Sequence, residues 1–278
     1  MQEVGAIPKL PVAGAVLGID VGFSATRASS AVCRLDWDAV RITWAIRRFR
    51  AVPAEQEAAV RAIAGDVWLA AAAFDGPLRA GLEVIGRYRV AERMLTRRLQ
   101  SKIGKPGQAS APVGKALNTA ANDCAALVIK ACQLAPATHA VRIDRKAIVE
   151  AFPSAFLGVM LRDPSTVTAE RGDRSDVFFQ HLTDRGALQL LLQHLLPDRK
   201  LKQSLNGVVN HDDRAALICA LTALAIAADD YTAVGDNDGW IILPPRRFVR
   251  SWARSDLEAN AREEKPGCWY QTVSLSSA

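Results

Sequence analysis

The sequence predicts an α/β fold in which a mixed β-sheet is flanked by helices. Three segments with the composition of strands follow one another near the N-terminus, and only turn-length gaps separate the last two. A segment with helical periodicity and a further buried strand come next, and long apolar helical segments occupy the second half of the chain. Half of the 278 residues are hydrophobic, which is enough for a sizeable core.

The N-terminal strands are expected to form an antiparallel meander. Strands are expected at 16–19, 28–35 and 41–49, and apolar residues alternate with polar ones in the third. The turn-like sequence DWDAV at 36–40 separates the second strand from the third, so no helix fits between them. Strands joined by short turns pair antiparallel, which predicts the meander.

A helix and a buried strand are expected after the meander, which makes the order βββαβ. Residues 55–64 have apolar positions at helical spacing, and 67–74 is a short apolar run that ends at Asp75-Gly76-Pro77. The basic, alanine-rich stretch at about 86–135 is broken by glycine and proline residues. We expect a helical insertion there, with a mobile loop at the break.

The second half of the chain is expected to complete the sheet and its helical cover. A further strand is expected at 146–152, and helices are expected at about 177–195 and 212–228. The sequence DGWIILPP at 238–245 predicts a closing strand or hairpin arm. Tryptophans 44, 68 and 240 lie in apolar segments and are expected to be in the core.

The net charge and the cysteines of the chain limit which partners and which cellular compartment are expected. The chain has 35 basic and 29 acidic residues, and the net charge of +6 permits an anionic partner without requiring one. No segment reaches the roughly 18 apolar residues of a membrane span, and the five cysteines include no CxxC pair. We expect a cytoplasmic protein with no membrane partner, whose residues 15–278 form one domain after a loose tail at 1–14.

Acidic residues stand at several expected strand ends and at one helix start. Asp20 ends the first strand, Asp75 ends the strand after the first helix, and Glu150 lies near the end of the next strand; Asp212 and Asp213 open a long apolar helix. Such positions can converge on one crevice of a mixed sheet. Converging carboxylates repel one another unless cations or protons neutralise them.

Oxygen ligands without nearby histidine or cysteine clusters suit Mg²⁺ or Mn²⁺. The sequence therefore predicts a metal site formed by Asp20, Asp75, Glu150 and Asp212, with Asp213 in reserve. Two such ions would support phosphodiester hydrolysis, and the first four residues are the expected catalytic ones. Each of them also has an ordinary interpretation as a cap, turn or ion-pair residue.

The basic part of the insertion is the expected contact for a nucleic acid. Arg93 and Arg97 are spaced to share one helix face, and guanidinium groups suit phosphate oxygens. The expected substrate-binding residues are Arg87, Arg93, Arg97, Arg98 and Lys102. One alternative is a solvated basic helix whose arginines pair with Glu83 and Glu92, and another is that these arginines bind a small phosphorylated metabolite.

Four motifs occur in order along the chain: LGIDVGFSATR at 17–27, FDGPL at 74–78, EAFPSAF at 150–156, and HDDRAALICALTALA at 211–225 with DGWIILPP after it. Together they resemble a predicted-nuclease family of ribonuclease H-like fold, the domain of unknown function 429. The resemblance implies a five-stranded mixed sheet and metal-dependent nuclease activity. The family usually has a second aspartate three residues after the first in the last motif, where this chain has Ala215. Asp213 is expected to point elsewhere, because positions three apart share a helix face.

Two alternatives come from other classes of protein. The first motif is also similar to the first phosphate loop of sugar kinases and other actin-like ATPases, whose second Asp-x-Gly loop has its nearest counterpart here at 236–239. The other alternative is a non-catalytic nucleic-acid-binding or scaffold protein of the same fold. Ala215 permits it, because an alanine in place of the family's aspartate removes a possible metal ligand. Among the histidines, only His211 beside Asp212 stands where it could orient a water or phosphate, and the alternative is an ordinary loop histidine.

Overall fold

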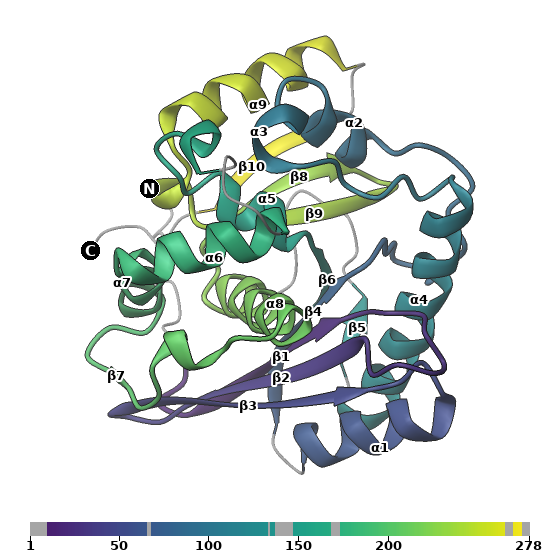
Figure 1. The fold of residues 1–278 in the computed structure, drawn as a ribbon, viewed down its shortest axis with the longest axis vertical. Coiled ribbons are helices and arrows are strands. Elements are labelled where there is room, and N and C mark those ends of the chain that lie inside the picture. The colour runs from purple at the N-terminus through teal and green to yellow at the C-terminus, as the bar shows by residue number, and fades with distance from the viewer. Residues whose placement is uncertain are drawn as a thin grey trace, which may run out of the picture.

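The computed structural model is an α/β protein with a mixed sheet between layers of helices (Figure 1). It describes residues 10–65, 68–132, 134–136, 147–167, 173–264 and 269–273. The strand order is β10-β8-β9-β6-β4-β1-β2-β3-β7, and β5 pairs with β6. The expected class is confirmed, and the sheet has more strands than the five that the resemblance implies.

The N-terminal meander has the expected topology. Strand β1 (Gly14–Asp20) pairs antiparallel with β2 (Ser30–Trp37), which pairs antiparallel with β3 (Arg41–Phe49). A two-residue edge strand, β7 (Lys200–Leu201), lies parallel to β3. Most of the expected N-terminal tail, residues 1–9, lies outside the described residues.

Three parallel strands form the centre of the sheet. Helix α1 (Pro53–Ala64) leads to β4 (Leu69–Asp75), which pairs parallel with β1. On its other side β4 pairs parallel with β6 (Ala147–Ala151). The carboxyl ends of these three strands therefore meet at one edge of the sheet, where a crevice can form.

The expected insertion is helical. It contains α2 (Val90–Thr96), α3 (Gln100–Ile103) and α4 (Pro112–Cys132), and the short strand β5 (Ala135–Pro136) follows it. These helices separate in space, because α4 packs against α1 and β4 while α2 packs against β8 at the other end of the sheet (Figure 1). The insertion thus covers two different parts of the molecule.

The single helix expected at 177–195 is two helices. After α5 (Pro153–Gly158), the chain forms α6 (Arg174–Asp184) and α7 (Ala187–Leu195). Gly186 separates them with a left-handed φ of 69°, which glycine adopts without steric cost. The helical periodicity continues across this break, so the pattern alone did not show it.

The long apolar helix is α8 (His211–Ala227), as expected. Next come β8 (Tyr231–Asp236) and β9 (Gly239–Leu243), an antiparallel hairpin with residues 236–239 at its turn. A hairpin turn is a different structure from a phosphate loop before a closing strand. Strand β9 does not close the chain either, because α9 (Ser251–Glu263) and β10 (Trp269–Val273) follow.

Side chains along each strand point alternately to the two faces of the sheet, so the core has one part on each face. Val16 of β1 packs on the face that α8 covers, with α5, α6 and α7 beyond it, and Leu17 and Ile19 pack on the face that α1 and α4 cover. The core prediction is correct for Trp240, which is buried, and wrong for Trp68, which is 53% exposed at the start of β4. Trp44 is partly buried against the α8 face.

Membrane-spanning helices and cysteine pairing concern the described ranges only. None of the helices there is long and apolar enough to cross a membrane. All four cysteines that the structure describes, at 33, 124, 132 and 219, are free thiols.

Candidate active site

Asp20 and Asp75 lie side by side at the carboxyl ends of β1 and β4. They are partners in the parallel register of these strands. Asp20 shares the α8 face with Val16, and Asp75 shares it with Ala71 and Ala73, because side chains two residues apart point to the same face of a strand. The sequence prediction that these two carboxylates converge is therefore supported by the geometry.

Helix α8 brings two more carboxylates to this edge. Its N-cap is Asn210, whose side-chain oxygen accepts hydrogen bonds from the backbone N–H groups of Asp212 and Asp213, at 2.9 and 3.3 Å. The helix lies directly on β1 at Gly18, where an added Cβ would be 2.0 Å from the backbone nitrogen of Ala220. This close approach sets the first turn of α8 beside the end of β1.

The negative charges of these acids act on one another. Burial raises the pKa of Asp20 well above its ordinary value, and the charges of Asp75, Asp212 and Asp213 raise it further. The charge of Asp213 reaches Asp20, but this does not place its side chain beside Asp20, so the expectation that Asp213 points elsewhere stays a prediction. Asp213 also has a basic partner: its Oδ1 lies 3.6 Å from Nε of Arg48 on β3.

Asp75, which lines the cavity described below, has a strongly raised pKa. Burial raises its pKa to about 7, the nearby charge of Glu150 adds to this effect, and His211 opposes it. His211 forms its own contact, with Nδ1 3.2 Å from Oδ2 of Asp176. That contact engages Nδ1 of the imidazole.

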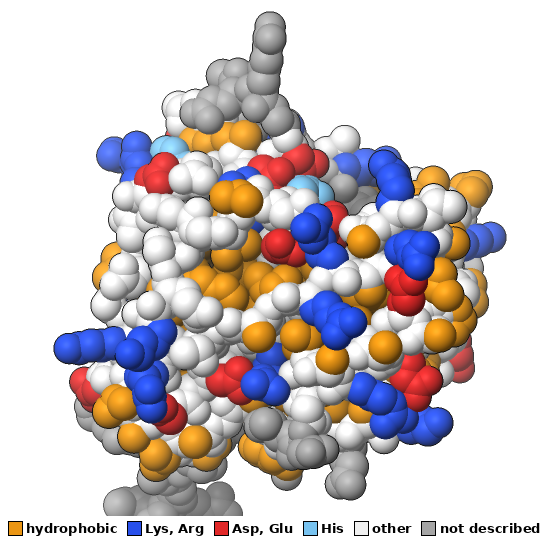
Figure 2. Space-filling view, turned by 60° about the horizontal axis from the view of Figure 1, so that its bottom comes forward, with side chains coloured by type: hydrophobic (Ala, Val, Ile, Leu, Met, Phe, Trp, Pro, Cys, Tyr) orange, Lys and Arg blue, Asp and Glu red, His pale blue; other side chains and the backbone are white. Residues whose placement is uncertain are grey.

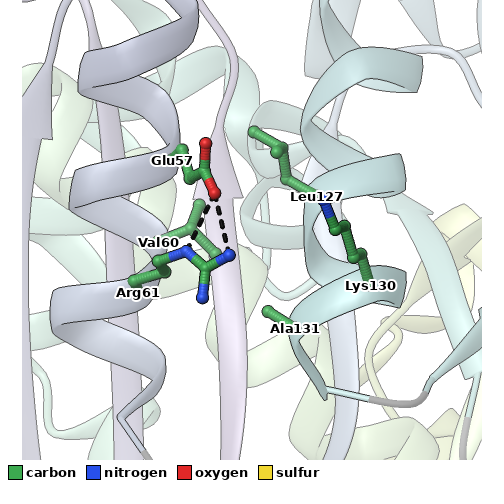
Figure 3. Close-up of a pocket in the computed structure, with 6 residues that line it drawn as sticks. All are labelled: Glu57, Val60, Arg61, Leu127, Lys130 and Ala131. Carbon is green, nitrogen blue, oxygen red and sulfur yellow. Dashed lines mark hydrogen bonds and ion pairs between the residues drawn. The ribbon is translucent and has the colours of Figure 1, made fainter.

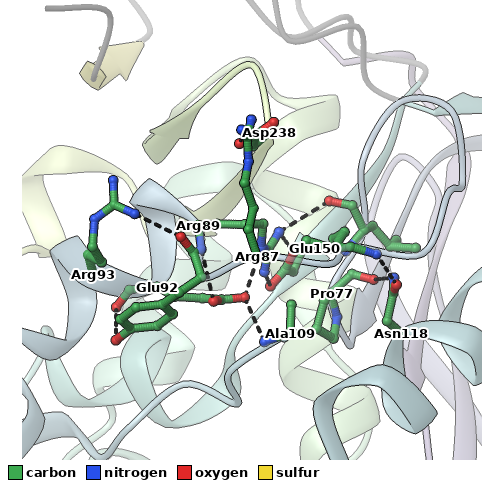
Figure 4. Close-up of polar contacts among 12 residues, drawn as sticks. Pro77, Arg87, Arg89, Glu92, Arg93, Ala109, Asn118, Glu150 and Asp238 are labelled. Atoms are coloured by element: carbon green, nitrogen blue, oxygen red, sulfur yellow. Dashed lines mark hydrogen bonds and ion pairs between the residues drawn. The ribbon is translucent and has the colours of Figure 1, made fainter. Parts of the chain in front are cut away.

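Glu150 does not join the carboxylate cluster, which corrects the sequence prediction. In the parallel register Asp75 is the partner of Ala151, whereas Glu150 is the partner of Phe74. Phe74 packs on the α1–α4 face, so Glu150 points to the face opposite Asp75. There both carboxylate oxygens bind Arg89, at 2.7 and 2.8 Å, and one also accepts the N–H of Leu78 at 2.9 Å (Figure 4).

Arg89, Glu92 and Glu150 form a buried ionic network that sequence reasoning missed. Arg89 is fully buried, and its Nε lies 2.9 Å from Oε1 of Glu92, which also accepts the N–H of Ala109 (Figure 4). Arg89 donates to the carbonyl of Leu78 as well, at 3.3 Å. The network therefore holds the segment that follows Asp75. The sequence gives no sign that this arginine is buried, because a run of basic residues is usually solvent-exposed.

Asn118 of α4 supports the same segment. Its side chain accepts the N–H of Ile85 at 2.8 Å and donates to the carbonyl of Pro77 at 2.7 Å (Figure 4). These bonds satisfy buried backbone groups on both sides of the turn. Asn118 thus stabilises the backbone behind Asp75 and is not among the residues that line the cavity described below.

The expected substrate-binding residues are engaged in ion pairs. Arg93, Arg97, Arg98 and Lys102 pair with α9 and the residue after it, through Glu264, Glu263, Glu263 and Asp256 respectively. Arg87 is 70% exposed and pairs with Asp238 of the β8–β9 turn (Figure 4). The alternative expectation is correct for Glu92, which pairs with Arg89 of the basic run, although that pair is buried rather than solvated. It is wrong for Glu83, which pairs with Arg79.

This pairing changes the interpretation of the basic stretch. The acidic partners lie more than 150 residues away in the sequence, which is why the charge pattern suggested an open basic face. On the face drawn in Figure 2, Lys and Arg side chains lie in separate groups with acidic side chains among them, rather than in one continuous track. The basic stretch itself is not an open basic face either, because all five expected substrate-binding residues have acidic partners.

A cavity of about 280 Å³ opens beside Asp75. The starts of α5, α6 and α8 border it, together with the segment after α3. Its polar lining residues are Asp75, Lys105, Ser154, Asp173, Arg174, Ser175 and His211. Ala215 lines the same cavity, so the position that the resembled family usually gives to an aspartate faces this space.

Two other hollows lack such a combination of groups. A recess of about 10 Å³ between α1 and α4 holds the Glu57–Arg61 ion pair opposite Leu127, Lys130 and Ala131, and has room for about one water (Figure 3). A larger one of about 390 Å³ lies between α7 and the β3–β7 edge. Its lining contains no carboxylate, so the cavity beside Asp75 is the best candidate site.

The fit to a divalent cation is partial. Within the ranges that the structure describes, no three His, Cys, Asp or Glu side chains are arranged to hold a metal ion. The donor chemistry suits Mg²⁺ or Mn²⁺, because the coupled groups Asp20, Asp75, Asp212 and Asp213 offer only oxygen atoms. The mutual charge that raises the pKa of Asp20 is the kind of repulsion that a bound cation relieves.

Comparison with protein-family models, with curated proteins and with solved structures finds no match to this chain.

Proposed function

We propose that this protein is a metal-dependent nuclease or related phosphoesterase with a ribonuclease H-like core. The observation that carries the proposal is the position of Asp20 and Asp75 as register partners at one sheet edge, where the charges of Asp212 and Asp213 also act on Asp20. Such like-charged groups lower the stability of the fold unless a bound cation or a proton neutralises them. The order of the four motifs along the chain supports the same assignment.

Asp20, Asp75 and Asp212 would hold the cation, with Asp213 at the periphery because it also contacts Arg48. When bound, Mg²⁺ or Mn²⁺ supplies Lewis-acid stabilisation of the charge that develops on phosphate oxygens. His211 lies at the cavity beside Asp75, where it would hold or release a proton. Glu150 serves the fold by neutralising Arg89 rather than by binding metal.

A non-catalytic nucleic-acid-binding protein of the same fold is the second candidate. Two observations favour it: Ala215 occupies the cavity position where a further carboxylate would stand, and Glu150 is committed to Arg89. Fewer carboxylates then remain for two cations. In this case the acidic edge would be a remnant of a metal site.

Cleavage of labelled single- and double-stranded DNA and RNA with Mg²⁺ or Mn²⁺ tests the first proposal. We expect Asp20→Asn and Asp75→Asn each to lower the rate at least about a hundredfold, because each removes a charge that would bind the cation. Asp123→Asn, at an exposed aspartate of α4, is the matched control and should retain the wild-type rate.

Thermal melting separates the roles of the acids. Mg²⁺ should raise the melting temperature of the wild type and of Glu150→Gln, and leave that of Asp20→Asn unchanged. If no substrate is cut and Mg²⁺ leaves the wild-type melting temperature unchanged, the metal proposal is wrong and the binding protein becomes the better assignment. Stabilisation by ATP in the same assay would instead favour the actin-like ATPase alternative.

A further inference from the structure

The cavity beside Asp75 has a cationic side that the metal proposal does not use. Lys105 and Arg174 line it, and they come from segments far apart in the chain. Lys105 is exposed and has no ion-pair partner among the residues that the structure describes. These side chains place two permanent positive charges close to the acidic sheet edge.

The other polar groups of the lining are already engaged. Asp173 caps α6 by accepting hydrogen bonds from the backbone N–H and the hydroxyl of Ser175, at 2.9 and 2.7 Å. The hydroxyl of Ser154 donates to the carbonyl of Ile103 at 2.6 Å. Arg174 uses Nη1 for the carbonyls of Gln100 and Ser101, at 3.0 and 3.3 Å, which leaves its remaining N–H donors for another acceptor.

Two helices of eight or more residues begin at this cavity. Arg174 is the first residue of α6, and His211 is the first residue of α8. Their first N–H groups are already bound by the N-caps Asp173 and Asn210, and acidic residues stand in both first turns. Lys105 and Arg174 therefore supply the attraction for an anion at this cavity.

We propose that this cavity binds a phosphate group of the substrate through Lys105 and Arg174. The inference deepens the proposed function and rests on it, because Asp75 lines the same cavity and a phosphate held there would lie next to the coupled carboxylates. A volume of about 280 Å³ is near the lower end of the range for small-ligand pockets, roughly 300–1,000 Å³. It suits one phosphate with its sugar. The phosphate is either a terminal monoester or an internal diester.

Binding without divalent cations tests the site apart from catalysis. Calorimetry in EDTA would use inorganic phosphate, a short single strand with a 5′-phosphate, and the same strand with a 5′-hydroxyl. Lys105→Ala should weaken binding of inorganic phosphate about tenfold, because a charge-assisted hydrogen bond is lost. The matched variant Lys115→Ala removes another exposed lysine, on α4 and outside the cavity lining, and should leave binding within about twofold.

The oligonucleotides distinguish the two sources of phosphate. If Lys105→Ala weakens only the 5′-phosphorylated strand, the site takes a terminal phosphate, and if it weakens both strands equally, the site takes an internal one. Equal affinity of Lys105→Ala, Lys115→Ala and wild type for every probe would overturn the inference. Phosphate binding that depends on Lys105 in a protein that cuts nothing would retain the subsite and reject the nuclease, so the two proposals fail separately.

Discussion

At the scale of single residues, two acids from neighbouring strands have opposite roles because their side chains occupy opposite faces. Asp75 lies on the α8 face among other carboxylates, and burial raises its pKa to about 7. Glu150 lies on the other face, where burial raises its pKa and Arg89 and the N–H of Leu78 oppose part of this rise. Paired buried charges serve structure, whereas a perturbed carboxylate at a cavity is a candidate for chemistry.

The raised pKa of Asp75 predicts a pH dependence of stability. Its pKa is about 7 in the folded protein and about 4 in the unfolded chain, so the folded state binds more protons between these values. The free energy of unfolding therefore falls as pH rises through this window. Without divalent cations, Asp75→Asn should melt at least about 3 °C above wild type at pH 8, and the difference should shrink toward pH 4.

Melting curves between pH 4 and 8 in EDTA check this expectation. Asp123→Asn serves again as the control, since that aspartate is exposed on α4. A constant difference between Asp75→Asn and wild type across the whole range would show that Asp75 does not titrate in this window.

At the scale of elements, the contact between β1 and α8 sets the site. Gly18 and Asp20 share a face of β1, and Asp212 precedes Ala216 by about one helical turn. An added Cβ at Gly18 would lie 2.1 Å from the carbonyl oxygen of Ala216, so only glycine permits this approach. The position of one glycine therefore determines where the acids of α8 stand.

Gly18→Ala should destabilise the protein by about 1–3 kcal/mol, because the backbone of α8 must move away from β1. The same shift should reduce the stabilisation by Mg²⁺, since it separates Asp212 from Asp20. Chemical denaturation with and without Mg²⁺ measures both effects. Gly207→Ala, where no atom lies within 4 Å of the added Cβ, is the control and should be close to wild type in both measurements.

At the scale of the whole molecule, ion pairs join the insertion to the C-terminal helix. Arg93 and Arg97 contact Glu264, which is largely buried, and Arg97 and Arg98 contact Glu263. Lys102 pairs with Asp256 and lies over the ring of Trp252 at 4.5 Å. In Figure 1, α2, α3 and α9 lie together at the β8–β10 end of the sheet. These pairs connect segments that are distant in sequence.

Replacing Glu263 and Glu264 together by glutamine should lower stability by about 1–2 kcal/mol at low salt, because several arginines lose their partners. The loss should be smaller in 1 M NaCl, where screening weakens these pairs in the wild type as well. Urea denaturation at two salt concentrations measures it. A loss that does not depend on salt would indicate packing rather than charge as its cause.

The sequence by itself determined several of the strands and helices and the placement of acids at the strand ends. Strong apolar periodicity predicted the meander, α1, β4, β6 and α8, and the acids at strand ends predicted that Asp20, Asp75 and the start of α8 would converge. Only the tertiary structure decided which face of β6 Glu150 occupies, because this depends on the strand register, and a shift of one residue reverses it. It also decided the partners of the basic stretch, since α9 becomes its neighbour only through folding.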